Sequence, residues 1–437
     1  MAVDRATNRF DLWHRTNPSP TIQGRGSGVP HRAPGADRMR RRTWRVWQRA
    51  VPKGGTHMAK KTRLALAGLG SVSQRGILPH LAQADALERV ELVACCDVVP
   101  GRATETARVY GWSEAYDAYD QMIAQADVDV VLVATPIPAH YDQIMKALGH
   151  GRHVYAQKTM TTTLAEANAV IELAKTKGLM VVASPGQMLN PTLASIRELV
   201  RGGGLGKVYW TFSTNAGGGH EQETFRTGND VLRNVDPTWY YKAGGGPVYD
   251  MAVYSLHTLT GIFGPVRRVT AVSGIGLPVR TWKDKEIAVE MDDNTLMLLD
   301  FGDATFALAG GQNSRIAPTI GWGRLTISGT RGTVDFGGGL GGLEVVSDAV
   351  LPEAFGTRGP RVFIPSAGLP GLKHVTGAHT SIQEPHVYND IMHMVECLET
   401  GSDPVPTAEH ARHVVEIIER AYLAASTGQT QDISSVF

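Results

Sequence analysis

The sequence predicts an α/β chain in which a doubly wound parallel sheet is followed by an α+β domain with a largely antiparallel, open sheet. Three observations predict this fold. Between residues 62 and 183, short apolar runs alternate with stretches of helical character. A glycine loop lies between the first apolar run and the first helical stretch. After residue 207, runs with alternating apolar and polar residues follow one another directly, as in antiparallel sheets.

The elements of the parallel sheet are predicted in the order of the chain. Because strands separated by helices of about 10–15 residues pair in parallel, these elements indicate a Rossmann-type sheet. We therefore expect a dinucleotide-binding domain at residues 58–183. The predicted strands are residues 63–67, 90–96, 128–134, 152–155 and 179–183, and the predicted helices are 74–84, 101–110, 139–149 and 164–177.

The second domain is predicted to span residues 184–437. A closing amphipathic helix is expected at residues 408–426. An antiparallel sheet commonly has one face free to pack on a partner. The predicted strands are residues 207–214, 267–273, 294–301, 305–309, 324–328 and 333–336.

The first 57 residues differ from the rest in charge and composition. Twelve basic against three acidic residues give this segment a charge of +9, whereas the whole chain has +1, so the remainder carries −8. The segment is rich in Arg, Pro and Gly and has no sustained apolar period, which is typical of unstructured chain. Residues 53–55 (KGG) are what a purine-rich ribosome-binding sequence would encode, and Met58 follows. We expect translation to begin at Met58 and leave residues 1–57 out of the fold prediction.

Composition excludes several classes of function. An acidic body argues against binding of nucleic acid, and no run of about 18 apolar residues is present for a membrane span. Cys95, Cys96 and Cys397 are too few for a disulfide framework and lack the spacing of a zinc site, so we expect no metal. Buried thiols in a reducing compartment predict a cytoplasmic protein.

The glycine loop has the pattern of a dinucleotide site. Gly68 permits a tight turn after the first strand, and Gly70 lets the backbone approach a pyrophosphate at the helix N-terminus. Ser71 and Val72 lie in the same loop. The third small position of the usual pattern is Ser73, which is nearly small enough for close packing of helix and strand.

Asp97 ends the second predicted strand, 27 residues after Gly70. A carboxylate at this place accepts hydrogen bonds from the adenosine ribose, which favours NAD over NADP. The nearby Arg102 offers a cation for a 2′-phosphate instead, so NADP stays possible. The sequence therefore predicts NAD as the cofactor, with NADP as the alternative.

Three segments carry a resemblance to a known family. They are residues 134–140 (ATPIPAH), 151–159 (GRHVYAQKT) and 244–257 (GGGPVYDMAVYSLH). In this order they resemble the glucose–fructose oxidoreductase / inositol dehydrogenase / rhizopine-catabolism (Gfo/Idh/MocA) family. The resemblance extends from about residue 61 to the C-terminus. It implies that a second copy of the chain covers the exposed face of the second-domain sheet, in a dimer or tetramer.

The resemblance implies roles for several residues. Thr135, Pro136 and His140 would border the cofactor, and Lys158 would be the lysine of a Glu-Lys-Pro motif. Here Gln157 replaces the glutamate and Thr159 the proline, which removes a charge beside the nicotinamide and puts the usual backbone turn in doubt. We also assign Gln187 to the cofactor site.

The second-domain motif places three polar side chains at helical spacing. Asp250, Tyr254 and His257 stand at i, i+4 and i+7, which predicts one shared helical face. Tyr254 is the first choice for the proton acceptor, and a neighbouring Lys158 would lower its pKa. Asp250 would orient the lysine or hold a substrate hydroxyl, and His257 is the reserve acid or base.

These observations predict an NAD(P)-dependent oxidoreductase acting on a secondary hydroxyl of a sugar, polyol or glycoside. One alternative is a redox-neutral enzyme that oxidises a sugar transiently, eliminates a leaving group and reduces the product. A second alternative is a sugar-sensing regulator without catalysis. Retention of Lys158, Asp250 and Tyr254 together argues against the regulator. A long loop at residues 217–234 is expected to set specificity.

Overall fold

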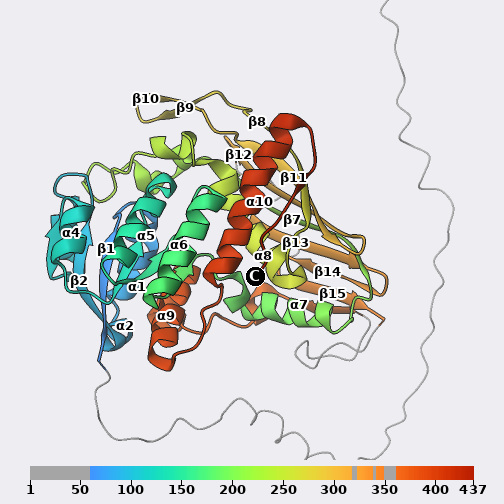
Figure 1. The fold of residues 1–437 in the computed structure, drawn as a ribbon, viewed down its shortest axis with the longest axis horizontal. Coiled ribbons are helices and arrows are strands. Elements are labelled where there is room, and N and C mark those ends of the chain that lie inside the picture. Colours follow the sequence, from blue (N-terminus) through green and yellow to red (C-terminus); the bar gives the residue numbers. More distant parts are fainter. Residues whose placement is uncertain (1–59, 317–321, 338–340, 349–360) are drawn as a thin grey trace, which may run out of the picture. The chain divides into compact units, whose positions relative to one another are not determined.

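The computed structural model of the chain describes residues 60–316, 322–337, 341–348 and 361–437. The expectation that residues 1–57 are an extension and that the protein begins at Met58 lies outside this part. Two large sheets, one parallel and one mostly antiparallel, carry helices on their faces (Figure 1). The predicted fold class is therefore confirmed. None of the described helices combines the length and apolar character that crossing a bilayer requires.

The parallel sheet has six strands in the order β3-β2-β1-β4-β5-β6. Its strand order reverses between β1 and β4, so a crevice for a ligand lies at their carboxyl ends. Helices on both faces bury the central strands, which explains their continuous apolar runs. The strands are β1 (Thr62–Ala67), β2 (Val90–Cys96), β3 (Glu114–Tyr116), β4 (Val130–Val133), β5 (His153–Ala156) and β6 (Val181–Ala183). The helices are α1 (Leu78–Leu81), α2 (Ala84–Arg89), α3 (Arg102–Tyr110), α4 (Tyr119–Gln125), α5 (His140–Gly149) and α6 (Leu164–Lys177).

The segment after the glycine loop differs from the prediction of one helix over residues 74–84. Ser73–Ile77 winds as a π-helical turn, and the short helices α1 and α2 follow it. Pro79 has no backbone N–H to donate to the carbonyl of Arg75, so a regular α-helical ladder cannot run through this point.

The second sheet has nine strands in the order β16-β15-β14-β13-β7-β12-β11-β8-β17. Within this sheet, β7 and β12 form the only parallel pair among the described strands. The six predicted strands correspond to β7, β8, β11, β12, β13 and β14, whereas the other strands are short or lie at edges. The strands are β7 (Val208–Gly218), β8 (Arg268–Gly274), β11 (Asn294–Gly302), β12 (Thr305–Ser314), β13 (Trp322–Gly329), β14 (Gly332–Phe336), β15 (Leu343–Ser347), β16 (Arg361–Ile364) and β17 (Gln431–Asp432), and a separate hairpin joins β9 (Val279–Trp282) to β10 (Lys285–Ala288).

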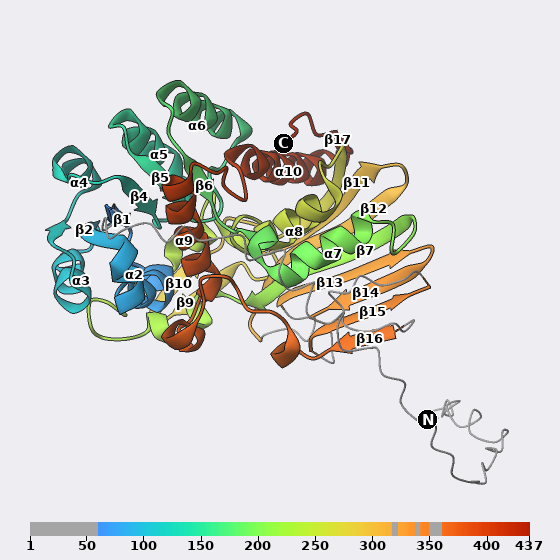
Figure 2. The same cartoon turned by 90° about the horizontal axis from the view of Figure 1, so that it is seen from below.

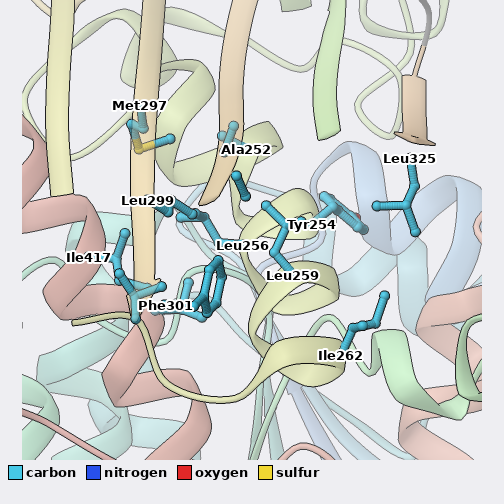
Figure 3. Packing of buried hydrophobic residues seen from close by; sticks show 14 of the residues in the cluster. Ala252, Tyr254, Leu256, Leu259, Ile262, Met297, Leu299, Phe301, Leu325 and Ile417 are labelled. Atoms are coloured by element: carbon cyan, nitrogen blue, oxygen red, sulfur yellow. The ribbon is translucent and has the colours of Figure 1, made fainter. Parts of the chain in front are cut away.

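One face of the second sheet packs against α7 (Pro191–Arg201), α8 (Val253–Phe263) and α10 (Ala408–Thr427) (Figure 2). Exposed and buried residues alternate along β11, which directs its buried residues to these helices. Burying a large apolar side chain, such as Met297 or Leu299 of β11, stabilises the fold by about 1.5–3 kcal/mol. This packing fixes the π-helical turn Val248–Ala252, which carries Asp250, and the start of α8, which carries Tyr254. Figure 3 shows the packed residues, which include Leu256, Leu259, Ile262, Met297, Leu299, Phe301 and Ile417.

The C-terminal helices also pack on the parallel sheet. Val387 and Ile391 of α9 (Pro385–Thr400) belong to the same apolar cluster as Leu64 and Leu66 of β1. Helix α10 contributes Val415 to the cluster on the other face of that sheet. The start of α9 is thereby held close to the glycine loop, far from it in the sequence (Figures 1 and 2).

Candidate active site

The glycine loop follows β1 and is shaped by contact with β4. Gly68 has a φ of +87°, and a Cβ at this position would lie 2.6 Å from the carbonyl carbon of Ala134. Both facts require glycine. The Ser73 hydroxyl donates a hydrogen bond to the Gly68 carbonyl oxygen at 2.6 Å. Serine at the third small position therefore closes the loop as well as fitting beside the strand.

A cavity of about 390 Å³ opens at the carboxyl ends of β1 and β4. The cavity is also lined by three residues from the segment after β7, namely Arg226, Val235 and Trp239. The parallel-sheet domain and the second domain therefore both build this cleft. Its lining includes all but two of the residues that the sequence assigned to the cofactor, namely Gly68, Gly70, Ser71, Val72, Asp97, Arg102, Thr135, Pro136, Gln157 and Lys158.

The two exceptions, His140 and Gln187, line neither this cleft nor the neighbouring cavity. His140 is fully buried, and its two ring nitrogens lie 2.9 Å from the Thr135 carbonyl oxygen and 2.8 Å from that of Thr159. It therefore supports the loops that carry cofactor-site residues. The Gln187 amide donates to the Thr258 hydroxyl at 2.9 Å, which turns it toward α8.

Asp97 and Arg102 form a buried ion pair, with 3.2 Å between Nη1 and Oδ1. The Asp97 carboxylate also accepts hydrogen bonds from the backbone N–H groups of Leu69 and Val99. The remaining Arg102 nitrogens donate to the carbonyl oxygens of Val231 and Asn234. The guanidinium is thus paired and held in place, so a 2′-phosphate would have to compete with Asp97 for it.

Gln157 provides a direct test of whether the cleft fits a nicotinamide dinucleotide. Its amide nitrogen donates to the Tyr155 hydroxyl at 2.8 Å, whereas its Oε1 is buried without a hydrogen-bond partner among the described residues. A buried acceptor of this kind requires a donor. Because Gln157 lines the cleft, an amide-bearing ligand can supply it, so the residues present fit the cofactor.

Lys158 stands on the wall that the cleft shares with a second cavity of about 670 Å³. Its Nζ donates to Oδ1 of Asp250 at 2.9 Å, in an ion pair that is largely buried. The peptide bond between Lys158 and Thr159 is cis, although residue 159 is not proline. Lys158 and Asp250, predicted from separate segments, therefore meet at one place.

His220 completes this charged group and was not predicted as a site residue. Its Nε2 lies 3.2 Å from Oδ2 of Asp250, and its Nδ1 lies 2.9 Å from Oε1 of Glu223. The neighbouring Glu221 is buried and paired with Arg280 at 3.2 Å, which anchors this part of the chain. The predicted specificity loop thus contributes a side chain that binds the Asp250 carboxylate.

The charges of this group stabilise one another. Burial alone would raise the pKa of Asp250, but the charges of Lys158 and His220 outweigh it and hold that pKa well below its usual range. Burial and the nearby Arg226 would lower the pKa of His220, but Glu223 and Asp250 raise it overall. The site therefore keeps Asp250 ionised and favours a protonated His220.

Tyr254 lines the second cavity, and its environment contradicts the expected fall in its pKa. The Lys158 ammonium lies 5.7 Å from the centre of the tyrosine ring and is paired with Asp250. Burial, together with the carboxylates of Glu384, Asp250 and Asp390, raises the pKa of Tyr254 well above its usual value. The hydroxyl is instead hydrogen-bonded to Nε2 of His386 at 2.9 Å.

His257 is a second correction, because it lines neither cavity. It is buried, its ring packs 4.8 Å from that of His410, and burial with His410 and His413 lowers its pKa well below the usual value. Seven residues place it roughly 10 Å along the helix from Asp250. In addition, Val248–Ala252 winds as a π-helix, which rotates the later turns relative to Asp250.

The second cavity contains other residues that the sequence did not single out. Trp322 and His386 line it, and Glu384 is shared with the first cleft. No local pattern marks these residues, because His386 and Tyr254 are 132 positions apart. The glycines at 217–219, which also line this cavity, were the one signal that pointed to this region.

Comparison with protein families gives two matches, which cover the parallel sheet and the larger part of the nine-stranded sheet. Residues 62–184 match the model of the oxidoreductase family with an NAD-binding Rossmann fold. Residues 193–335 match the model of the GFO/IDH/MocA C-terminal domain.

Comparison with individual proteins agrees with the family matches. D-xylose 1-dehydrogenase (NADP(+)) from Hypocrea jecorina is 28% identical over 57% of this chain and 64% of its own length. D-apiose dehydrogenase from Paraburkholderia graminis is 24% identical over 87% of this chain and 92% of its own. A structure of levoglucosan dehydrogenase with NADH and levoglucosan has the same fold, with a TM-score of 0.68 at 19% identity, over 86% of this chain and 100% of that one.

Proposed function

Because the chain belongs to the GFO/IDH/MocA family of NAD-binding oxidoreductases, we propose that it transfers hydride between a nicotinamide cofactor and a secondary hydroxyl of a sugar, polyol or glycoside. The observation that carries this proposal is the Lys158–Asp250 ion pair on the wall shared by the two cavities. The names of the relatives, which act on D-xylose and D-apiose, support the substrate class. We assign cofactor binding to residues 58–183, and substrate binding and oligomerisation to residues 184–437.

The side chains on this wall have separate roles in the proposed reaction. A nicotinamide dinucleotide bound in the first cavity supplies the hydride acceptor. Asp250 orients the Lys158 ammonium, and this cation stabilises the negative charge that develops on the substrate oxygen as its proton leaves. Tyr254 takes that proton. His257 has no role in this scheme because it lines neither cavity.

A substrate screen tests the proposal. The full chain is incubated with NAD and a set of sugars, polyols and glycosides, and the absorbance of reduced cofactor is followed. We expect stoichiometric NADH from at least one of them. Conversion of a glycoside without any NADH would instead support the redox-neutral enzyme. Binding of a sugar without conversion would support the non-catalytic regulator.

We expect NAD to bind more tightly than NADP, because Asp97 repels a 2′-phosphate and holds Arg102. Asp97→Ala removes a charged acceptor, so NAD affinity should fall by about tenfold to a hundredfold. The affinity for NADP should fall less than the affinity for NAD, because the substitution frees the Arg102 guanidinium for a 2′-phosphate. Calorimetric titration of each cofactor measures both changes.

The matched control for this prediction is Asp97→Asn, which keeps an acceptor for the Leu69 N–H but removes the charge. If the negative charge of Asp97 disfavours NADP, Asp97→Asn should also reduce the difference between the affinities for NAD and NADP. Tighter binding of NADP than of NAD by the unmodified chain would show that the roles of Asp97 and Arg102 are reversed.

We also propose that a second copy covers the free face of the nine-stranded sheet. The strand pairings place the exposed side chains of Trp210, Val272, Leu296, Leu298 and Phe306 on one face, opposite the buried residues of β11. An apolar surface of this kind on a soluble domain marks an interaction site.

The mass in solution at micromolar concentration should therefore be two or four times that of one chain, as measured by light scattering. Leu298→Glu places a charge in the middle of this face and should dissociate the assembly, whereas Glu286→Gln on the separate β9–β10 hairpin should not. A monomeric mass for the unmodified chain would refute the proposal.

The cellular location is part of the proposal as well. Cys95, Cys96 and Cys397 are free, buried thiols, which supports a reducing compartment such as the cytoplasm.

A further inference from the structure

The start of α9 brings a histidine and a glutamate to the cavity that contains Tyr254. His386 lies in the first turn of this helix, and its Nε2 is 2.9 Å from the Tyr254 hydroxyl oxygen. Its Nδ1 is 3.8 Å from Oε2 of Glu384. Both residues line the cavity, so the three side chains form a row of a hydroxyl, an imidazole and a carboxylate.

Glu384 is held in place by several independent features. It has a φ of +56°, which is uncommon for a residue with a side chain and is frequent near active sites. Its carboxylate is paired with Arg75 at 3.0 Å. Gly76 allows this approach, since a Cβ at Gly76 would lie 2.6 Å from the Glu384 Cβ. The carboxylate is therefore built into the site.

The groups around His386 keep its imidazole neutral. Burial is the main cause that lowers its pKa to about 4; Lys158 and Arg75 lower it further, and Glu384 opposes them. The charge of His386 in turn contributes to lowering the pKa of His80. A neutral imidazole that accepts the Tyr254 hydrogen bond at Nε2 carries its own proton on Nδ1, which is the nitrogen nearer to Glu384.

We propose that His386 is the final acceptor of the substrate hydroxyl proton, with Tyr254 relaying the proton and Glu384 stabilising the imidazolium that forms. This inference rests on the proposed function and extends it, since it assigns the fate of the proton that the oxidation releases. The three residues lie along the wall of the cavity in the order that such a transfer needs.

The transfer balances in atoms and charge. The substrate carbon loses hydride to the cofactor, and the hydroxyl oxygen becomes a carbonyl oxygen as its proton moves to the Tyr254 oxygen. The original Tyr254 proton moves at the same time to Nε2 of His386. The tyrosine is unchanged at the end, and one proton has been gained by the imidazole. His386, which is partly exposed in the cavity, then returns this proton to water.

A relay is needed because Tyr254 cannot serve as a phenolate base at neutral pH. Burial and the surrounding carboxylates keep its hydroxyl protonated. A neutral hydroxyl can accept a proton only if it gives its own proton away simultaneously. The hydrogen bond to His386 is the one route for that proton that the described residues provide.

The test compares substitutions at His386 with a control on the same helix. His386→Gln retains a hydrogen-bonding group but cannot take a proton, so kcat should fall by about a hundredfold with KM changed less than about threefold. Glu384→Gln should show a smaller loss, on the order of tenfold. His393→Gln lies two turns further along α9, outside both cavities, and should keep the activity of the unmodified chain.

Two further measurements separate proton transfer from a structural role. His386→Ala leaves a space beside Tyr254, and added imidazole should restore its kcat by at least about tenfold. Nitrogen NMR of histidine-labelled full chain should show the His386 Nε2 signal shifting in Tyr254→Phe. That NMR signal needs no substrate, so it reports on the relay even if the proposed function fails.

Three results would overturn the inference. They are near-normal kcat in His386→Gln, a failure of imidazole to rescue His386→Ala, and a His386 signal that Tyr254→Phe leaves unchanged. By contrast, the absence of turnover of any sugar, polyol or glycoside by the unmodified chain would refute the proposed function, while the NMR comparison would still decide whether Tyr254 and His386 share a proton.

Discussion

Replacement of Lys158 by alanine is expected to reduce kcat by at least about a thousandfold, because the cation that stabilises the developing charge is lost. The cofactor affinity should change by less than about threefold, since the glycine loop, Asp97 and the other residues of the cleft remain. The folded state should also persist, because Asp250 keeps its contact with His220. Steady-state kinetics and calorimetric titration of NAD measure the two quantities separately.

The control for this prediction is Lys146→Ala. Lys146 is a more exposed lysine on α5 that pairs with Asp120 and Asp142, and none of these three residues lines either cavity. Surface ion pairs contribute little, so its removal should leave kcat within about twofold. A Lys158→Ala variant with substantial turnover would mean that another group stabilises the substrate oxygen.

Replacement of Tyr254 by phenylalanine is expected to lower kcat by about 10²–10⁴-fold, because it removes the hydroxyl that takes the substrate proton. The ring stays, so its packing against Trp322, with centroids 5.3 Å apart, is retained and KM should change little. Steady-state kinetics at saturating cofactor measures this loss.

The pH dependence of the unmodified chain follows from the same contacts. The raised pKa of Tyr254 excludes a tyrosine titration on the acid side. His386 accepts a proton only when it is neutral, which holds above its pKa of about 4. The rate of oxidation should therefore be constant toward mildly acidic pH and fall only as the pH drops through about 4.

His257→Asn provides the comparison for Tyr254→Phe. Because His257 packs against His410 and lines neither cavity, this substitution should affect stability more than catalysis. Its unfolding temperature should fall, whereas kcat of the folded protein should remain close to normal. If instead Tyr254→Phe stays active and His257→Asn does not, the histidine is the base and the tyrosine is only a wall of the cavity.

The fold and much of the cofactor cleft could be predicted from short-range patterns. Two such patterns are the alternation of apolar and polar residues along β11 and the apolar runs of β1, β2 and β4. Because they depend on residues close in the sequence, they can be recognised without the tertiary structure. The glycine loop is recognisable for the same reason, since the positive φ of Gly68 belongs to the turn after β1, whereas its close approach to Ala134 depends on the tertiary structure. The prediction of one regular helix after the glycine loop was wrong because Pro79 interrupts the backbone hydrogen bonds. This cause, too, is local in the sequence.

The candidate site was only partly predictable, because its charges depend on residues that are distant in the sequence. The spacing of Asp250, Tyr254 and His257 suggested one helical face, but a π-helical turn and the depth of His257 along α8 separate that histidine from the others. The pKa of Tyr254 depends on burial and on the carboxylates around it, and no pattern within one segment contains that information.

By itself, the sequence determined the order of the elements, the parallel and antiparallel sheets and the presence of a glycine loop followed by Asp97. These follow from side-chain periodicity and from the backbone freedom of glycine, which are properties of neighbouring residues. Only the tertiary structure decided that Lys158 pairs with Asp250, that His220 joins them and that Tyr254 meets His386. Those contacts exist because α9 and the segment after β7 pack against elements far away in the chain, and apolar packing fixes that arrangement without leaving a local pattern.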